Sequence, residues 1–137
     1  MRYGELPVIL VVEDEPLVAM AIADCVTDAG CQVLGPIGNL SDALKTARNG
    51  RFDAALLDAN LGGRNVDELA AWLAQSSIPF TFVTGYGKDL LPHAFRHVKV
   101  LTKPYDEDEL KQVIRNMVGW GVNPASAYAH YMVDHER

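Results

Sequence analysis

Short apolar runs alternate along this chain with stretches in which apolar residues recur at helical spacing. The runs at residues 8–12, 54–57 and 80–83 are continuous stretches of apolar or β-prone residues, as strands covered on both faces of a parallel sheet should be. Residues 32–34 and 98–101 are weaker strand candidates. Because parallel strands need crossover helices between them, the alternation predicts an α/β fold built on a doubly wound five-stranded parallel sheet.

Helical stretches separate these runs. Three of them carry apolar residues at helical spacing, at residues 18–29, 40–47 and 66–73. The clearest helix, at residues 106–118, begins with a capping pair formed by Asp106 and Glu109. Residues 85–97 contain two glycines and Pro92, so we expect the fourth of the five helices to be short or irregular.

The chain of 137 residues has the length of one compact domain, and 49% of its residues are hydrophobic, which is enough to build a core. We expect the domain to cover residues 1–118 and a C-terminal extension to cover residues 119–137. The extension carries Trp120, Tyr128 and Tyr131. Two interpretations of it stay open, a short helix packed on the domain and a mobile extension.

Charge and composition limit the partners and the location. A net charge of −6 opposes attraction to nucleic acid phosphates, so we expect no nucleic acid partner. The apolar run at 8–12 is too short for a membrane span or a signal-peptide core, which favours a cytoplasmic protein. Cys25 and Cys31 cannot build a disulfide framework and fit a reducing cytosol as small buried hydrophobes.

Polar residues follow most of the predicted strands. In an open α/β sheet, ligands bind outside the carboxyl ends of the strands, so residues at these ends are candidates for a site. They are Glu13, Asp14, Asp58, Asn60, Thr84 and Lys103. Each one alone is most simply a turn former or a solvated side chain, and only their joint placement at neighbouring strand ends points to a site.

Three carboxylates at one edge repel one another, and a divalent cation is the simplest way to offset their charge. Oxygen ligands without a nearby Cys or His favour Mg²⁺ over zinc. The sequence therefore predicts a Mg²⁺ site beside a strand-end carboxylate, Asp58.

Four motifs in this order, VVEDEP, LLDANL, FVTGYG and LTKPY, are similar to those of the response-regulator receiver domains of bacterial two-component signalling. The resemblance covers about residues 7 to 118. It implies the flavodoxin-like or CheY-like form of the predicted fold.

The resemblance also implies roles for individual residues. Asp58 would be the phosphoryl acceptor, Asp14 a direct Mg²⁺ ligand, and Glu13 an acidic partner that acts mainly through water. The backbone carbonyl of Asn60 would complete the protein's share of the metal shell. Lys103 would pair with the phosphoryl oxygens, the Thr84 hydroxyl would bond one of them, and Pro104 would favour a cis bond that positions the lysine.

The function that the resemblance implies is that of a single-domain response regulator. It would accept a phosphoryl group from a histidine kinase or a phosphotransfer protein and pass the signal on through a changed protein-binding surface. A downstream target protein and a second copy of the chain are the expected further partners. Its chemistry would be limited to its own phosphorylation and dephosphorylation. Residues 79–86 resemble a receiver subfamily with a Phe-Ala-Thr-Gly-Tyr motif, with Val83 in place of the Ala.

One position departs from the family. Most receivers carry a Tyr or Phe three residues before the lysine, and Val100 stands there in this chain. We hypothesise that ordering of residues 85–97 carries the signal instead, with Tyr86 or Tyr105 as the moving ring. Tyr86 as an ordinary exposed aromatic is the other interpretation.

Three alternatives stay open. A haloacid-dehalogenase-type phosphatase would need a general acid two residues after Asp58, where this chain has Asn60, and an amide cannot serve. A flavodoxin-like cofactor carrier would need a phosphate-binding loop, but the acids Glu13, Asp14 and Glu15 follow the first strand. A receiver that works only as an adaptor, without phosphorylation, is the third.

Overall fold

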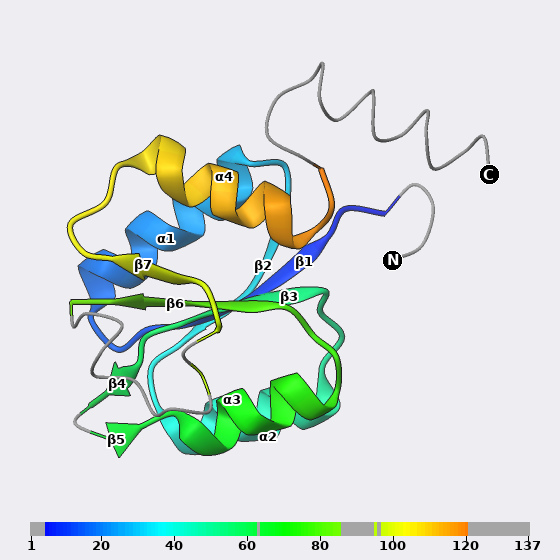
Figure 1. Cartoon of the computed structure of the whole chain (residues 1–137), viewed down its shortest axis with the longest axis vertical. Coiled ribbons are helices and arrows are strands. Elements are labelled where there is room, and N and C mark those ends of the chain that lie inside the picture. Colours follow the sequence, from blue (N-terminus) through cyan, green and yellow to red (C-terminus); the bar gives the residue numbers. More distant parts are fainter. Residues whose placement is uncertain (1–4, 63, 86–94, 96, 121–137) are drawn as a thin grey trace.

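The structure is a computed structural model that describes residues 5–62, 64–85, 95 and 97–120. Five parallel strands form one sheet in the spatial order β2-β1-β3-β6-β7 (Figure 1). The strands are β1 (Val8–Val12), β2 (Gln32–Ile37), β3 (Ala54–Leu57), β6 (Phe80–Thr84) and β7 (Val100–Thr102). Strand order reverses between β1 and β3, which makes the carboxyl ends of these two strands the expected ligand position in a doubly wound sheet.

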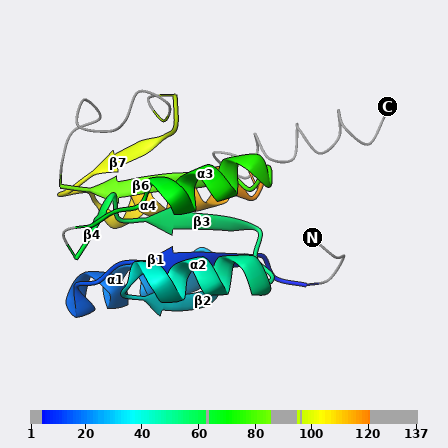
Figure 2. The ribbon, with the colours of Figure 1, turned by 90° about the horizontal axis from the view of Figure 1, so that it is seen from below.

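Helices cover both faces of the sheet. One face carries α1 (Pro16–Asp28) and α4 (Glu107–Met117), and the other carries α2 (Leu40–Asn49) and α3 (Asp67–Gln75). Figure 2 shows the α2 and α3 face toward the viewer, with α1 and α4 behind the sheet. Each helix pair encloses its own apolar cluster against the sheet, so β1 and β3 are buried from both sides.

Local sequence explains where the helices begin. The Asp106 carboxylate accepts the backbone N–H of Glu109, and the Glu109 carboxylate accepts that of Asp106, which is the predicted capping box of α4. Asn39 caps α2 by accepting the N–H of Asp42. Pro16 opens α1, where its missing N–H costs nothing.

The predicted fold class is confirmed, with small differences at the ends of strands. The three continuous apolar or β-prone runs are the central strands, while β2 extends further than predicted, to Ile37, and β7 begins later, at Val100. The described residues contain four of the five expected helices. The prediction of a short or irregular fourth helix falls mostly on residues outside the described ranges.

A short hairpin was not predicted. It follows β3 and pairs β4 (Asn60–Leu61) with β5 (Arg64–Asn65) in antiparallel fashion. Each strand is only two residues long, which is too short to leave a periodic signal in the sequence. The hairpin matters because it carries backbone groups to the edge of the sheet where the acidic residues lie.

The described chain ends beside α1. Trp120 packs against the apolar cluster between α1, α4 and the sheet, and a Cβ built on Gly30 would lie 3.2 Å from the Trp120 ring. Gly30 also has a φ of +94°, so both the backbone conformation and the closeness of the Trp120 ring favour glycine at this position. Residues 121–137 lie outside the described ranges, and the division of the chain at residue 118 stays a prediction.

Cys25 and Cys31 are both free thiols and are buried in this same cluster, as expected of small hydrophobes. No helix among the described residues is both long enough and apolar enough to cross a membrane.

Candidate functional site

The predicted site residues meet at the carboxyl edge of the sheet. Glu13 and Asp14 follow β1, Asp58 follows β3, Thr84 ends β6, and Lys103 follows β7. Backbone hydrogen bonds continue the strand pairing beyond the strand ends. The N–H of Asp58 donates to Val12 O (2.9 Å), and the N–H of Lys103 donates to Thr84 O (2.8 Å). The sheet itself therefore fixes where these side chains start.

Three carboxylates form a compact acidic cluster. Glu13, Asp14 and Asp58 each offer an oxygen, and these oxygens all lie within 4.8 Å of one another. Glu13 is 2% exposed and Asp58 is 9% exposed, so two of the three charges are shielded from water. Charges this close repel one another strongly in a partly buried setting, and the cluster needs a compensating cation.

Each of the three carboxylates is held by a backbone N–H. Asp58 Oδ1 accepts from Asn60 (3.1 Å), and Asp14 Oδ2 accepts from Gly62 (3.0 Å). Glu13 Oε2 accepts a longer bond from Glu15 (3.2 Å). These bonds fix the orientation of the carboxylates before any ligand arrives, which lowers the cost of ordering them on binding.

The Lys103 ammonium enters the cluster from β7. Its Nζ lies 2.9 Å from Glu13 Oε1, and the Glu13 side chain is only 1% exposed. The Lys103–Pro104 peptide bond is cis, as predicted. Among the described residues, Lys103 is thus the cation that compensates the acids, and it pairs with Glu13 rather than with Asp58.

Electrostatics distinguish Asp58 from an ordinary surface carboxylate. Burial raises the pKa of Asp58 to about 6, the N–H of Asn60 opposes this rise, and the nearby Glu13 charge adds to it. Burial acts to lower the pKa of Lys103, but its hydrogen bond to Glu13 and the charges of Glu13 and Asp58 raise it above the ordinary value. At neutral pH Lys103 therefore stays protonated and Asp58 is mostly ionised.

The donor set fits a hard divalent cation. Only oxygen atoms belong to the acidic cluster, and the described residues bring no Cys or His into it. The N–H of Asn60 on Asp58 brings the Asn60 backbone to the same place. Glu13 has one oxygen on Lys103 and the other on Glu15 N, which suits a role through water better than direct ligation.

Gly62 was not predicted to take part in the site. Its N–H holds Asp14, and its φ of +57° is a conformation that favours glycine. A signal did exist, since a Gly-Gly pair between Leu61 and Arg64 is a typical two-residue hairpin turn.

Val100, in the place of the family's aromatic residue, packs against the apolar cluster on the α2 and α3 face, which contains Phe82 and Phe95. The rings of Phe80, Phe82 and Phe95 lie 5.6 to 6.5 Å apart, centroid to centroid, in edge-to-face arrangements. Phe95 was not singled out from the sequence, although it is 8% exposed and anchors the chain before β7.

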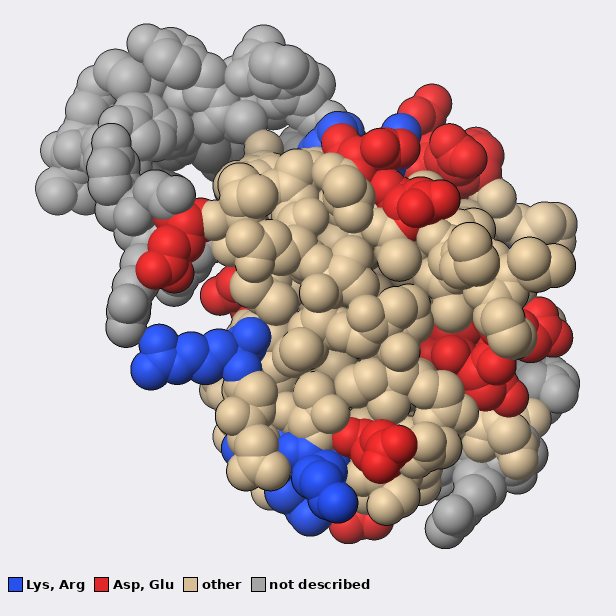
Figure 3. All heavy atoms as spheres, turned by 180° about the vertical axis from the view of Figure 1, so that it is seen from behind, with Lys and Arg blue, Asp and Glu red and all other residues tan. Residues whose placement is uncertain are grey.

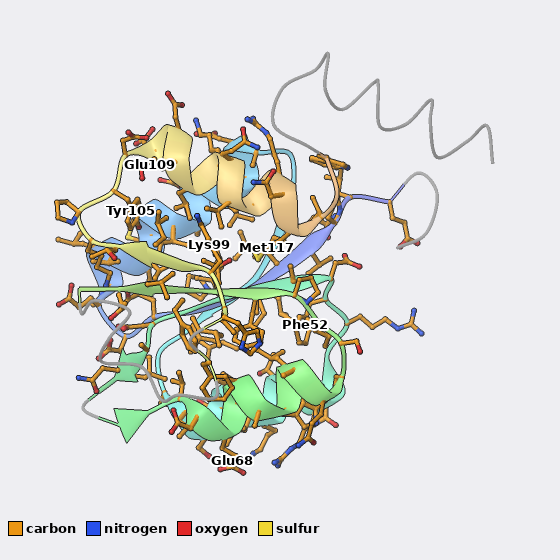
Figure 4. All side chains as sticks on the ribbon, viewed as in Figure 1. Phe52, Glu68, Lys99, Tyr105, Glu109 and Met117 are labelled. Carbon is orange, nitrogen blue, oxygen red and sulfur yellow. The ribbon has the colours of Figure 1, made fainter. Side chains whose placement is uncertain are left out.

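Of the two tyrosines expected to move in signalling, the structure describes only Tyr105. Tyr86 lies outside the described residues. Tyr105 is half-buried against the cluster on the α1 and α4 face, and burial raises the pKa of its hydroxyl. Figure 4 shows Tyr105 on the segment that leads from β7 to α4.

Comparison with known proteins agrees with this geometry. The family described as "Response regulator receiver domain" matches residues 9–115. The solution structure of SdrG from Sphingomonas melonis Fr1 is 37% identical, with 82% of this chain and 97% of that chain covered and a TM-score of 0.73. The BeF3-activated conformation of SdrG from Pseudomonas melonis Fr1 is also 37% identical, covering 81% and 95%, with a TM-score of 0.68.

A third relative is the response regulator REC domain of PhyR from Erythrobacter litoralis. It is 25% identical, with 87% of this chain and 95% of that chain covered and a TM-score of 0.73. A search of curated protein sequences found no match. From the family match over most of its length and the SdrG relationship, the chain belongs to the response regulator receiver domain family.

Proposed function

We propose that this protein is a phosphorylation switch in which Asp58 accepts a phosphoryl group from a phosphohistidine of a sensor kinase or a phosphotransfer protein. The observation that carries the proposal is the convergence of a shielded carboxylate, Asp58, with two further acids and the Lys103 ammonium at one sheet edge. The relationship to SdrG, for which a BeF3-activated conformation is described, supports an active switch over a silent adaptor.

Asp58 supplies the nucleophile. Because Asp58 Oδ1 already accepts the Asn60 N–H, we assign Oδ2 as the attacking oxygen. The bond from Oδ2 to phosphorus forms as the bond from phosphorus to the histidine nitrogen breaks, and the imidazole leaves with the electron pair. No general base is needed, because the ionised carboxylate carries no proton to remove.

Cationic and polar groups then stabilise the phosphoryl oxygens. Lys103 would move its ammonium from Glu13 to one of these oxygens, and the Thr84 hydroxyl, at the end of the neighbouring strand, would bond another. Asp14, Asp58 and the Asn60 carbonyl would hold Mg²⁺, with Glu13 acting mainly through water. Bound there, Mg²⁺ supplies positive charge for phosphoryl oxygens.

The partner surface begins beside the acids. α1 starts two residues after Asp14, and its Leu17 and Met20 side chains are 82% and 61% exposed. Exposed large apolar residues next to a reactive carboxylate suit a docking partner that must bring its phosphohistidine to Asp58. We therefore propose that a kinase or phosphotransfer protein docks over α1 and the loop after β7.

The signal would leave from another face. β7 and α4, together with residues 85–97, form the proposed output surface for a target protein or a second copy. Membership of the Phe-Ala-Thr-Gly-Tyr subfamily, from the likeness of residues 79–86, and a cytoplasmic location belong to the same proposal. Asn60 in place of a general acid argues against turnover of small phosphate esters.

Intact-mass measurement after incubation with acetyl phosphate and Mg²⁺ tests the acceptor. We expect one phosphoryl group on the wild type and none on Asp58→Ala. A matched control, Asp28→Asn on the exposed end of α1, should be modified like the wild type. Modification of Asp58→Ala, or none on the wild type in a protein that stays folded, would refute the proposal.

A further inference from the structure

A hollow of about 470 Å³ lies at the amino edge of the sheet, opposite the acidic cluster. Its size is within the range of ligand-binding pockets, roughly 300 to 1,000 Å³. Figure 4 shows Phe52 at this edge, just before β3 begins. We call it the amino-edge groove and define it by Leu6, Arg48, Arg51, Phe52, Trp72 and Ile78.

The floor of the amino-edge groove is apolar. Phe52, Trp72 and Ile78 are half-buried and pack against the cluster between the sheet and the helices α2 and α3. Leu6, on the rim, is 51% exposed, although most large apolar side chains of the described residues are covered. Aromatic and aliphatic surface gathered in a hollow indicates that another group covers it.

Two arginines, Arg48 and Arg51, and two acids line the rim of the groove. Arg48 is exposed and also lies 3.4 Å from the Glu68 carboxylate outside the groove. Figure 3 shows basic side chains at the left and lower left of the molecule, with acidic side chains beside them. Glu5 and Asp53 also line it, but the Asp53 carboxylate accepts the N–H of Val8 (2.8 Å) and is committed to the sheet. Two arginines around an apolar floor select a ligand with apolar side chains next to carboxylates.

The chain's own continuation has this chemistry. α4 runs toward the amino edge, and in Figure 1 its end lies at the same edge as the start of β1. Residues 121–137 lie outside the described ranges, so only their sequence enters the argument. Tyr128, Tyr131 and Met132 have the spacing of one helix face, and Asp134 and Glu136 follow them.

The segment is long enough to reach the groove. A chain of this length extends up to roughly 55 Å, whereas a domain of this size has a radius of gyration of roughly 14 Å. We propose that residues 121–137 bind in the amino-edge groove of the same chain. Their apolar side chains contact Phe52 and Trp72, and their carboxylates pair with Arg48 and Arg51. This proposal does not depend on the phosphorylation of Asp58.

A nitroxide label on the whole chain tests the contact. Cys25 and Cys31 are each 4% exposed, so Ala129→Cys offers the reactive thiol. The protein has two tryptophans, and their indole N–H signals report on two places. The Trp72 signal should be broadened by the label because Trp72 lines the groove. The Trp120 signal, close to the label in the sequence, should be broadened in either case and serves as the internal reference.

Charge reversal then tests recognition. Arg48→Glu combined with Arg51→Glu should remove the broadening of Trp72, and adding Asp134→Arg and Glu136→Arg should restore it. Lys45→Glu, on the exposed surface of α2 outside the groove, is the matched control and should leave the broadening unchanged.

Two results would overturn the proposal. If the indole N–H signal of Trp120 is broadened and that of Trp72 is not, the segment does not occupy the groove. Broadening of Trp72 that disappears on tenfold dilution would assign the groove to the segment of a second copy. Broadening that persists at every concentration tested and depends on the four charges supports binding within one chain.

Discussion

At the carboxyl edge of the sheet, the acids Glu13 and Asp58 are shielded from water and lie close together, and their arrangement works against folding. At the amino edge, Asp53 accepts a backbone N–H from Val8 and ties the starts of two neighbouring strands together. Both edges belong to the same five strands. The Asp53 carboxylate therefore stabilises the fold at the amino edge, whereas the repulsion among the acids destabilises it at the carboxyl edge.

The difference lies in the partners. Asp53 completes the hydrogen bonding of the sheet, and its loss would leave a donor without its acceptor. The acids at the carboxyl edge are held close to one another for a ligand, and Lys103 compensates only part of their charge. Stability should therefore respond to cations and to pH at the carboxyl edge, and this separates the two edges experimentally.

Removing Lys103 should have the largest effect. Without metal, Lys103→Met leaves the buried Glu13 carboxylate without its cation, and we expect the free energy of unfolding to fall by about 3 kcal/mol. Mg²⁺ should recover part of the loss, because a cation returns to the cluster. Urea unfolding followed by tryptophan fluorescence, in chelator and in Mg²⁺, measures both.

Lys111→Met is the matched control. Lys111 lies 3.8 Å from an Asp28 side chain that is 61% exposed, so we expect a change below about 0.5 kcal/mol. Equal losses in the two variants would show that the Lys103 pair behaves like a surface pair.

Asp58→Asn should stabilise the protein in chelator. Burial raises the pKa of Asp58 from 3.8 to about 6, so at neutral pH the folded state carries a charge that it holds less well than the unfolded chain does. Asp14, next to Asp58 in the cluster, is exposed, so solvent screens part of this cost, and we expect a gain of about 1 to 2 kcal/mol.

The pH dependence fixes the sign of that effect. Because the folded pKa is the higher one, the folded wild type binds a proton first as the pH falls through 6 toward 3.8, and its stability rises relative to Asp58→Asn. The advantage of the variant should shrink over this window. Unfolding of both proteins across it is the measurement, and a constant difference would rule out the raised pKa of Asp58 as the cause.

Asp53→Ala should act at the amino edge alone. Losing the 2.8 Å bond to the N–H of Val8 should cost about 1 kcal/mol. The loss should be the same in chelator and in Mg²⁺, because the residue lies at the opposite edge from the acidic cluster. Asp53→Asn keeps an acceptor oxygen and should lose less. A Mg²⁺-dependent loss would mean that the two edges are coupled.

The fold could be predicted because its central strands are buried on both faces. β1 and β3 are continuous apolar runs in the sequence for this reason. β2 and β7 lie at the edges of the sheet, are partly exposed, and have correspondingly weak signals in the sequence. The meeting of Asp14, Asp58 and Lys103 followed from the fold, because parallel strands bring their carboxyl ends to one side.

The partners within the site could not be predicted. The sequence does not say which of three neighbouring carboxylates Lys103 contacts. All three lie close together, so a lysine side chain that reaches one of them could reach the others. The donors that hold Asp14 and Asp58 are backbone N–H groups, which every residue except proline carries. The amino-edge groove joins residues from four separated stretches of the chain, and no local pattern connects them.

Glu68→Gln should have the smallest effect of these variants on the free energy of unfolding. Glu68 lies 3.4 Å from Arg48, and the two side chains are 66% and 53% exposed, as the outward position of Glu68 in Figure 4 also indicates. Water and salt screen such a pair, so we expect a loss below about 0.5 kcal/mol that disappears in high salt. The Lys103 variant, whose partner is shielded from solvent, should keep most of its loss under the same conditions. If unfolding in high salt removed both losses alike, burial would no longer explain why the Lys103–Glu13 pair and the Arg48–Glu68 pair contribute differently to stability.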